Sequence, residues 1–225
     1  MELDFSVLIP YMHMFWKGVC VTIQASFFGV LFGSALGIFI GSFRVMPFKP
    51  LRYLMATYIY VLRGTPLMIQ LFLIYFGLPA LGVNLDAATA GILGIGINSS
   101  GYVGEIVRGG IEGVPKGQWE AAKMLGLSYW QTMKSIILPQ ALRLAIPAWS
   151  NEYSIILKDS ALAFVIGAPE IMARTQFVAS RTYQHLPLYL AAGLLYFLLT
   201  WVGVAALRRL ERRVRIPGYS GEARP

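Results

Sequence analysis

The sequence predicts an all-α integral membrane protein that crosses the bilayer five times as one domain. Of its 225 residues, 56% are hydrophobic and 13% are charged, the balance of a multispanning membrane protein. The apolar residues gather in five long runs, and a membrane-crossing helix needs about 20 such residues. The net charge of +8 does not indicate nucleic acid binding, because Lys and Arg cluster at the ends of the apolar runs.

The first predicted span covers residues 16–43, and no charge follows Lys17 within it. Small residues recur at every fourth position along this span, at Gly29, Gly33, Gly37 and Gly41. This spacing leaves one smooth side of a helix, where a second helix can approach closely. We expect tight helix packing along this stripe, with either the second span or another copy of the chain as the partner.

The second predicted span, residues 53–79, is interrupted by Arg63 and Pro66. Proline has no N–H to donate, so it disturbs the helix and frees a carbonyl of the preceding turn, around Leu62. The remaining predicted spans are 87–107, 140–166 and 186–207. Residues 1–215 are thus predicted to form a single transmembrane domain, followed by a flexible cytoplasmic tail at 216–225 that contains Gly and Pro.

Basic residues predict the orientation of these spans. If the N-terminus lies outside, 14 of the 19 Lys and Arg residues fall on the cytoplasmic side. They lie between the first two spans, around the loop of residues 115–138, and after the fifth span. The reverse orientation would invert this bias. We therefore expect an external N-terminus, a cytoplasmic C-terminus and a cytoplasmic loop at 115–138.

This loop is amphipathic, and residues 118–125 are rich in helix-forming side chains. Gly126 follows where a helix would end with a residue in the left-handed conformation. Ser128 and Gln131 have the spacing of a capping box that opens a second helix. Pro139 either stops that helix or begins the next span. The pattern predicts two short helices joined at a glycine, available to a cytoplasmic partner.

The same loop resembles a family signature. Residues 120–139 read EAAKMLGLSYWQTMKSIILP and are similar to the EAA loop of the membrane subunits of ATP-binding-cassette (ABC) importers. Residues 63–79, 100–117 and 157–171 resemble the polar amino-acid branch of these permeases. In that family the loop forms coupling helices that sit in a groove of the ATPase. The coupling residues that this resemblance implies are Glu120, Ala121, Ala122, Leu125, Gly126 and Leu127.

The resemblance implies a type I ABC importer permease fold in a prokaryotic inner membrane, with lipid around it. It also implies two membrane subunits, identical or paralogous, two copies of an ATPase subunit, and an extracytoplasmic amino-acid-binding protein. ATP and Mg would be bound by the ATPase, and this chain would need no cofactor. Transport would proceed by alternating access as ATP draws the coupling helices together. An ordinary amphipathic hairpin on the membrane surface is the alternative interpretation of the loop.

Ionisable residues at membrane depth are costly, so they usually face a cavity or a partner. Glu152 and Asp159 share one face of a helix, about 10 Å apart along its axis, which suits an ammonium group or a cationic side chain. In the alternative, these carboxylates, Lys158 and Arg63 neutralise one another and fix the helix register. The candidate substrate-binding residues are Glu152, Asp159, Asn98, Thr65, Ser99 and Leu162.

The sequence contains no motif that indicates catalysis. It has no Gly-x-x-x-x-Gly-Lys-Ser/Thr loop for ATP phosphates, no His-Glu-x-x-His and no Cys-x-x-Cys. Cys20 is the single cysteine, and His13 and His185 are isolated, so we predict no metal site. The chain is predicted to be a transport subunit and not an enzyme, with ATP hydrolysis in a separate subunit.

The predicted function is therefore the permease subunit of an ATP-driven amino-acid uptake transporter. Two carboxylates against one lysine on the fourth span favour a basic amino acid, arginine above the others, with glutamine or another polar amino acid next. The alternative function is a secondary transporter or channel that needs no ATPase, in which the charges of the fourth span relay ions or protons.

Overall fold

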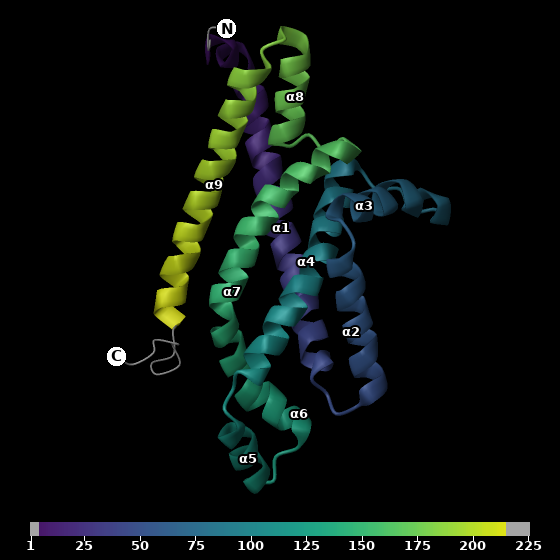
Figure 1. Ribbon diagram of the computed structural model, residues 1–225, viewed down its shortest axis with the longest axis vertical. Helices are drawn as coiled ribbons and strands as arrows, with labels where there is room; N and C mark the ends of the chain where they lie inside the picture. The colour runs from purple at the N-terminus through teal and green to yellow at the C-terminus, as the bar shows by residue number, and fades with distance from the viewer. Residues whose placement is uncertain (1–4, 215–225) are drawn as a thin grey trace.

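A computed structural model describes residues 5–214, and the predicted tail at 216–225 lies outside the described residues. Long helices run along the molecule, and α1, α4 and α7 pack together in its middle (Figure 1). The elements are η1 (Phe5–Tyr11), α1 (Met12–Arg44), α2 (Lys49–Gly64), α3 (Leu67–Phe72), η2 (Leu73–Gly77), η3 (Leu78–Leu81), α4 (Ala87–Glu112), α5 (Lys116–Met124), α6 (Tyr129–Thr132), η4 (Met133–Ile137), α7 (Leu138–Asp159), η5 (Ser160–Ile166), α8 (Ile171–Thr182) and α9 (His185–Val214).

Helices α1 and α4 pack against each other along the predicted glycine stripe. A Cβ atom at Gly33 would lie 2.8 Å from the carbonyl oxygen of Gly96, and one at Gly41 would lie 2.5 Å from that of Gly104. These distances are too short for a real contact, so the two backbones approach as only glycine permits. Tight packing is confirmed, but the expected partner is wrong, because the stripe faces the third predicted span.

The second predicted span is not one straight helix. Helix α2 ends at Gly64, and the chain continues from Leu67 to Leu81 at 103° to it. Thr65 is extended, with φ −114° and ψ 139°, as the residue before a proline prefers. Figure 1 shows the second part projecting sideways from the body as the arm that contains α3. Pro66 therefore breaks the predicted span of residues 53–79 into two helical pieces.

The predicted count of five spans remains a prediction. By length and composition, two helices among the described residues can cross a membrane, Phe5–Arg44 and His185–Arg213. A third is added if the bent pair of Lys49–Gly64 and Leu67–Leu81 counts as one span. The other two predicted spans correspond to α4, whose charged residues all lie at its C-terminal end, and to α7 with η5.

Helix α4 begins at a strong N-cap. The Asp86 carboxylate accepts hydrogen bonds from the Thr89 hydroxyl at 2.5 Å and from the backbone N–H groups of Ala88 and Thr89 at 3.0 Å. These bonds lower the pKa of Asp86, with the Thr89 hydroxyl as the largest cause. The ionised carboxylate thus satisfies N–H groups that have no partner within the helix.

Helix α8 is held in place by the fully buried Glu170. Its carboxylate accepts hydrogen bonds from the N–H groups of Met172 at 2.7 Å and Ala173 at 2.6 Å, and from the Tyr196 hydroxyl of α9. One side chain therefore caps α8 and ties it to α9.

Candidate coupling surface and translocation site

Two short helices joined at Gly126 form the end of the molecule opposite the N-terminus (Figure 1). Helix α5 ends in a Schellman motif: Leu127 N–H donates to the Ala122 carbonyl at 3.1 Å, and Gly126 N–H donates to the Lys123 carbonyl at 3.0 Å. Gly126 has a φ of 73°, in the left-handed region. The prediction of two helices with a left-handed glycine between them is confirmed.

The second helix of the loop opens with the predicted capping box. Gln131 N–H donates to the Ser128 hydroxyl oxygen at 3.3 Å, and Ser128 N–H donates to Gln131 Oε1 at 2.8 Å. Helix α6 then runs through a π-helical segment, Met133–Ile137, directly into α7. Pro139 lies in the first turn of α7, so it begins that helix and does not stop the loop.

The apolar side chains at the tip of the loop point away from the body. Met124 is 88% exposed and Leu125 is 76% exposed. Ala122 is buried and Leu127 is half-buried, so these two residues hold the turn together. Met124 and Leu125 therefore form an exposed apolar tip on the loop. The exposed members of the predicted coupling set are Glu120, Ala121, Leu125 and Gly126.

A groove of about 320 Å³ lies beside these helices and is lined in part by Trp119 and Tyr129. Their rings stack at 5.9 Å between centroids, which holds α5 against α6. The Tyr129 hydroxyl is buried without a hydrogen-bond partner in the described part of the chain, and burial raises the pKa of Tyr129. The two short helices are therefore packed as one unit.

A second cavity, of about 180 Å³, lies among α3, α4 and α7. Glu152, Asp159 and Asn98 all line it, so the structure brings together three of the predicted substrate-binding residues. Glu152 is only 6% exposed, and Asp159 is half-buried. Tyr102 also lines the cavity, and the Arg63 guanidinium lies over its ring at 5.2 Å from the centroid. This cavity thus combines two carboxylates, an amide and a cation held at its edge.

Three other predicted residues do not line this cavity. Ser99 is buried against α1, where a Cβ atom at Gly33 would lie 2.9 Å from its hydroxyl oxygen. Leu162 packs on an apolar cluster around Leu71. The Thr65 hydroxyl donates to the Val61 carbonyl at 2.8 Å. In this structure Ser99, Leu162 and Thr65 contact other parts of the protein, and their role in binding a substrate stays a prediction.

A hydrogen-bond network joins the bend after α2 to the cavity, and we call it the bend network: Leu62, Thr65, Gln70 and Asn98. Gln70 Nε2 donates to the Leu62 carbonyl at 2.9 Å, to the Thr65 carbonyl at 3.1 Å and to the Thr65 hydroxyl at 2.7 Å. Asn98 Nδ2 donates to Gln70 Oε1 at 3.2 Å and to the Leu62 carbonyl at 3.4 Å.

The prediction that Pro66 frees the Leu62 carbonyl is confirmed, because that carbonyl accepts from side chains instead of from residue 66. Gln70 itself was not predicted from the sequence. The available signal was an amide in an apolar run just after a proline, where a freed carbonyl needs a donor.

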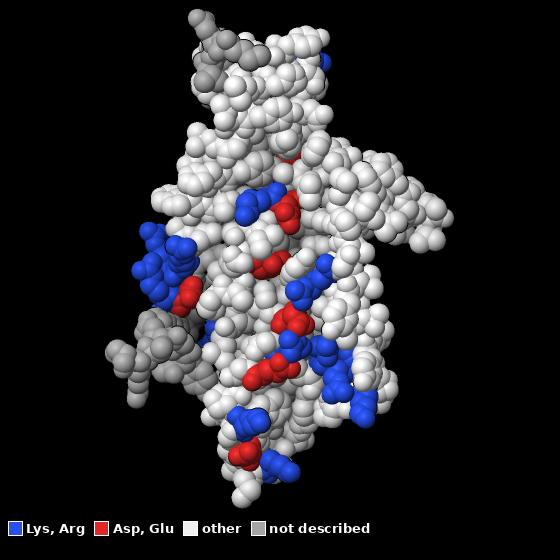
Figure 2. Space-filling view, in the orientation of Figure 1, with Lys and Arg blue, Asp and Glu red and all other residues white. Residues whose placement is uncertain are grey.

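Charged side chains follow one face of the molecule. Figure 2 shows acidic and basic patches in turn down the middle of this face, over α7, α4 and the loop below them. Among residues 5–214, the ion pairs within 4 Å are those of Arg108 with Glu105 and with Glu112. Within this part of the chain, Glu152 and Asp159 therefore form no ion pair with Lys158 or Arg63.

Known proteins resemble this chain over most of its length. Residues 33–216 match the family described as "Binding-protein-dependent transport system inner membrane component". The arginine transport system permease protein ArtQ of Bacillus subtilis is 38% identical over 216 residues, covering 94% of this chain and 99% of that protein. The glutamine transport system permease protein GlnP of Escherichia coli is 35% identical over 218 residues, covering 96% and 100%.

A solved structure of an amino acid ABC transporter "with histidines" superimposes with a TM-score of 0.85 at 38% identity, covering 95% of this chain and 100% of that chain. The chain is thus similar to amino-acid ABC transporter permeases both in its sequence and in the arrangement of its helices. The chain therefore belongs to the binding-protein-dependent transport family, as the inner-membrane permease subunit of an amino-acid ABC importer with the all-helical type I fold and with ATP hydrolysis in a separate subunit.

Proposed function

We propose that this permease carries a basic amino acid, arginine above the others, through the cavity lined by Glu152 and Asp159. Glutamine or another polar amino acid is the second candidate. The strongest support is the pair of carboxylates at one cavity, without an ion pair in the described part of the chain. Burial of a carboxylate that forms no ion pair is costly, so an incoming guanidinium or ammonium group would supply the missing partner.

The loop of residues 115–138 is the proposed coupling element. Its tip carries the exposed Met124 and Leu125, and Gly126 and the capping box hold its two helices at a defined angle. Through η4 the loop continues into α7, which carries Glu152 and Asp159. A force applied to the tip by the ATPase would therefore reach the cavity through one continuous helical path.

The proposed assembly contains two permease chains, identical or paralogous, two ATPase subunits that bind ATP and Mg, and an extracytoplasmic amino-acid-binding protein. We infer five spans, with the N-terminus outside and the C-terminus in the cytoplasm, from the distribution of Lys and Arg. This orientation places the loop of residues 115–138 where an ATPase can reach it.

The coupling proposal is tested at Gly126. A valine there would adopt φ 73° at a cost of about 1–2 kcal/mol, so Gly126→Val should distort the turn and abolish uptake while membrane insertion stays normal. The control is Gly117→Val, since Gly117 lies in α5 without a positive φ, and a Cβ atom added there would meet no heavy atom within 4 Å. Normal uptake by Gly126→Val would contradict the coupling role.

The substrate proposal is tested by a panel of amino acids with Glu152→Gln and Asp159→Asn. Loss of a charged hydrogen bond is worth about 1.5–3 kcal/mol, so each change should weaken arginine transport by roughly tenfold or more. Glutamine transport by the same variants should change less, and Glu211→Gln on α9 is the matched control. If a variant loses arginine and glutamine transport equally, the carboxylate that it replaces has a structural role and does not select the substrate. Uptake by the permease alone, driven by an ion gradient, would favour the secondary-transporter alternative.

A further inference from the structure

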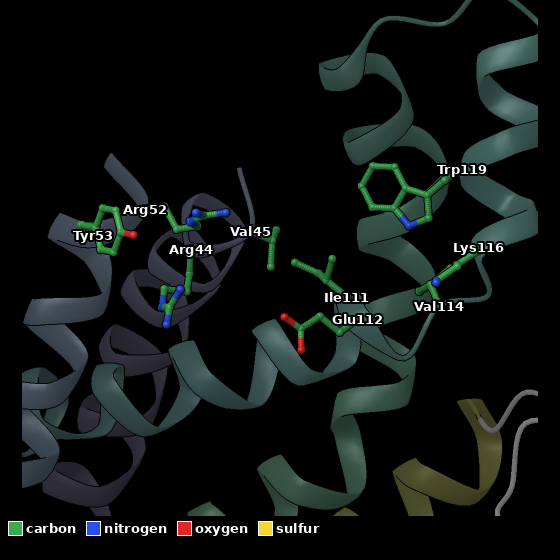
Figure 3. Close-up of a pocket in the computed structure, with 9 residues that line it drawn as sticks. All are labelled: Arg44, Val45, Arg52, Tyr53, Ile111, Glu112, Val114, Lys116 and Trp119. Carbon is green, nitrogen blue, oxygen red and sulfur yellow. The ribbon is translucent and has the colours of Figure 1, made fainter. Parts of the chain in front are cut away.

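A separate cleft of about 690 Å³ lies where α1 ends, α2 begins and α4 meets α5. Arg44 reaches it from the end of α1, Arg52 from the start of α2, and Lys116 from the start of α5. Figure 3 shows the two arginines on one side of the cleft, with Lys116 and Trp119 on the other. None of these residues lines the cavity that holds Glu152.

The cleft carries an excess of positive charge. Glu112 is the single carboxylate among its lining residues, and it already forms an ion pair with Arg108. Within residues 5–214, Arg44, Arg52 and Lys116 form no ion pair within 4 Å. Arg44 and Arg52 are both half-buried, so they are confined at the cleft. Such a site favours an anion, and a phosphate offers the oxygens that arginine binds best.

Apolar surface continues from the cleft along α2. Tyr53, which lines the cleft, is 64% exposed, and the neighbouring Phe48 and Leu54 are 61% and 60% exposed. A free phosphate would leave this surface uncovered, whereas the acyl chains of a phospholipid would cover it. Tyr53 and Trp119 are also residues that prefer the boundary between hydrocarbon and water. The charge and the apolar surface together therefore favour a lipid over a free anion.

We propose that this cleft binds the headgroup of an anionic phospholipid of the cytoplasmic leaflet, with its phosphate on Arg44 and Arg52 and its acyl chains along α2. Basic pockets between helices at the cytoplasmic side of a membrane suit such headgroups. The proposal rests on the inferred orientation of the chain, but not on the substrate or on the coupling role. Because Lys116 begins α5, the lipid joins the α1–α2 connection to the loop of residues 115–138.

Native mass spectrometry of the permease purified with its ATPase subunit tests this site. Delipidated complex is titrated with phosphatidylglycerol and, separately, with phosphatidylcholine of the same acyl chains. The variants are Arg44→Gln/Arg52→Gln and the charge-retaining Arg44→Lys/Arg52→Lys. The control is Arg212→Gln/Arg213→Gln, which removes the same charge from the exposed end of α9. Co-purification with the ATPase shows that each variant is folded.

Phosphatidylglycerol should bind in preference to phosphatidylcholine, and Arg44→Gln/Arg52→Gln should weaken it by roughly 10- to 30-fold. The lysine pair should retain most of the binding, and the α9 control should retain all of it. If the glutamine variant and the α9 control lose phosphatidylglycerol binding equally, the proposal is overturned. Binding would then depend on the total charge of the protein and not on this cleft.

Two further outcomes would also overturn it. If inorganic phosphate binds as tightly as the lipid and displaces it, the cleft is a site for free anions. If lipid binds the isolated permease but not the complex, the ATPase covers the cleft. Because no arm of this experiment measures transport, its failure would be distinguishable from failure of the proposed function.

Discussion

Replacing Gln70 by leucine is the sharpest perturbation of the bent second segment. Gln70 is only 7% exposed, and its amide holds the Leu62 and Thr65 carbonyls and accepts from Asn98. Leucine has a similar size but offers no hydrogen bond. The Thr65 carbonyl would lose the donor that Gln70 supplies, and the Leu62 carbonyl would retain only the longer bond from Asn98, at 3.4 Å.

The expected cost follows from these acceptors. A buried polar group that loses its partner costs about 1–3 kcal/mol, and hydrogen bonds between membrane helices average about 0.6 kcal/mol. We therefore expect Gln70→Leu to lower the free energy of unfolding by about 1–3 kcal/mol. In a double-mutant cycle with Asn98→Leu, the coupling energy between the two side chains should be about 0.5–1.5 kcal/mol.

The assay is reversible unfolding of the purified permease in mixed detergent micelles titrated with sodium dodecyl sulfate. The matched control is Gln176→Leu, the same substitution at an exposed position of α8, which should change the free energy of unfolding by less than about 0.5 kcal/mol. Arginine uptake is measured in parallel, since release of Asn98 would disturb the cavity that it lines. Additive effects of Gln70→Leu and Asn98→Leu, with no coupling energy, would refute the bend network.

Two other changes probe the helix contacts. Gly41→Ala would place a Cβ atom 2.5 Å from the Gly104 carbonyl oxygen, so the free energy of unfolding in the same micelles should fall by about 1–3 kcal/mol. The control is Gly193→Ala, whose Cβ atom would meet no heavy atom within 4 Å, and it should leave the free energy of unfolding unchanged. Glu170→Ala removes the cap of α8 and leaves the Tyr196 hydroxyl without its acceptor, so it should lower the free energy of unfolding by about 2–4 kcal/mol. Glu170→Gln keeps one acceptor oxygen and should cost less; an equal cost for both would argue against the hydrogen bonds.

Local signals in the sequence were sufficient to predict the structure of the loop of residues 115–138. The left-handed glycine, the capping box and the two short helices depend on residues within about one turn of each other, so no distant contact needs to be known. The same holds for the carbonyl that Pro66 frees, because proline acts on the turn before it. Each of these features appears at the predicted position, with Gly126 at φ 73° as the plainest case.

Contacts between distant segments were not predictable in the same way. The glycine stripe of α1 predicts a close partner, yet nothing in its spacing distinguishes one neighbouring helix from another. Its actual partner is fixed by complementary small residues on α4, where Gly96 and Gly104 meet Gly33 and Gly41. The glycine stripe in the sequence therefore predicts that another helix packs there, but it does not identify that helix.

The proposed substrate site illustrates a second limit, because the direction of a side chain depends on the rotation of its helix, which hydropathy does not reveal. Asn98 and Ser99 are adjacent polar residues of α4, and successive residues on a helix point about 100° apart. Asn98 lines the cavity, while Ser99 is buried against α1. Asn98 is further held by Gln70, which bonds to the carbonyl that Pro66 leaves free. The position of the Asn98 amide at the cavity thus depends on a proline in another segment, and this link becomes visible only when the bend brings the two segments together.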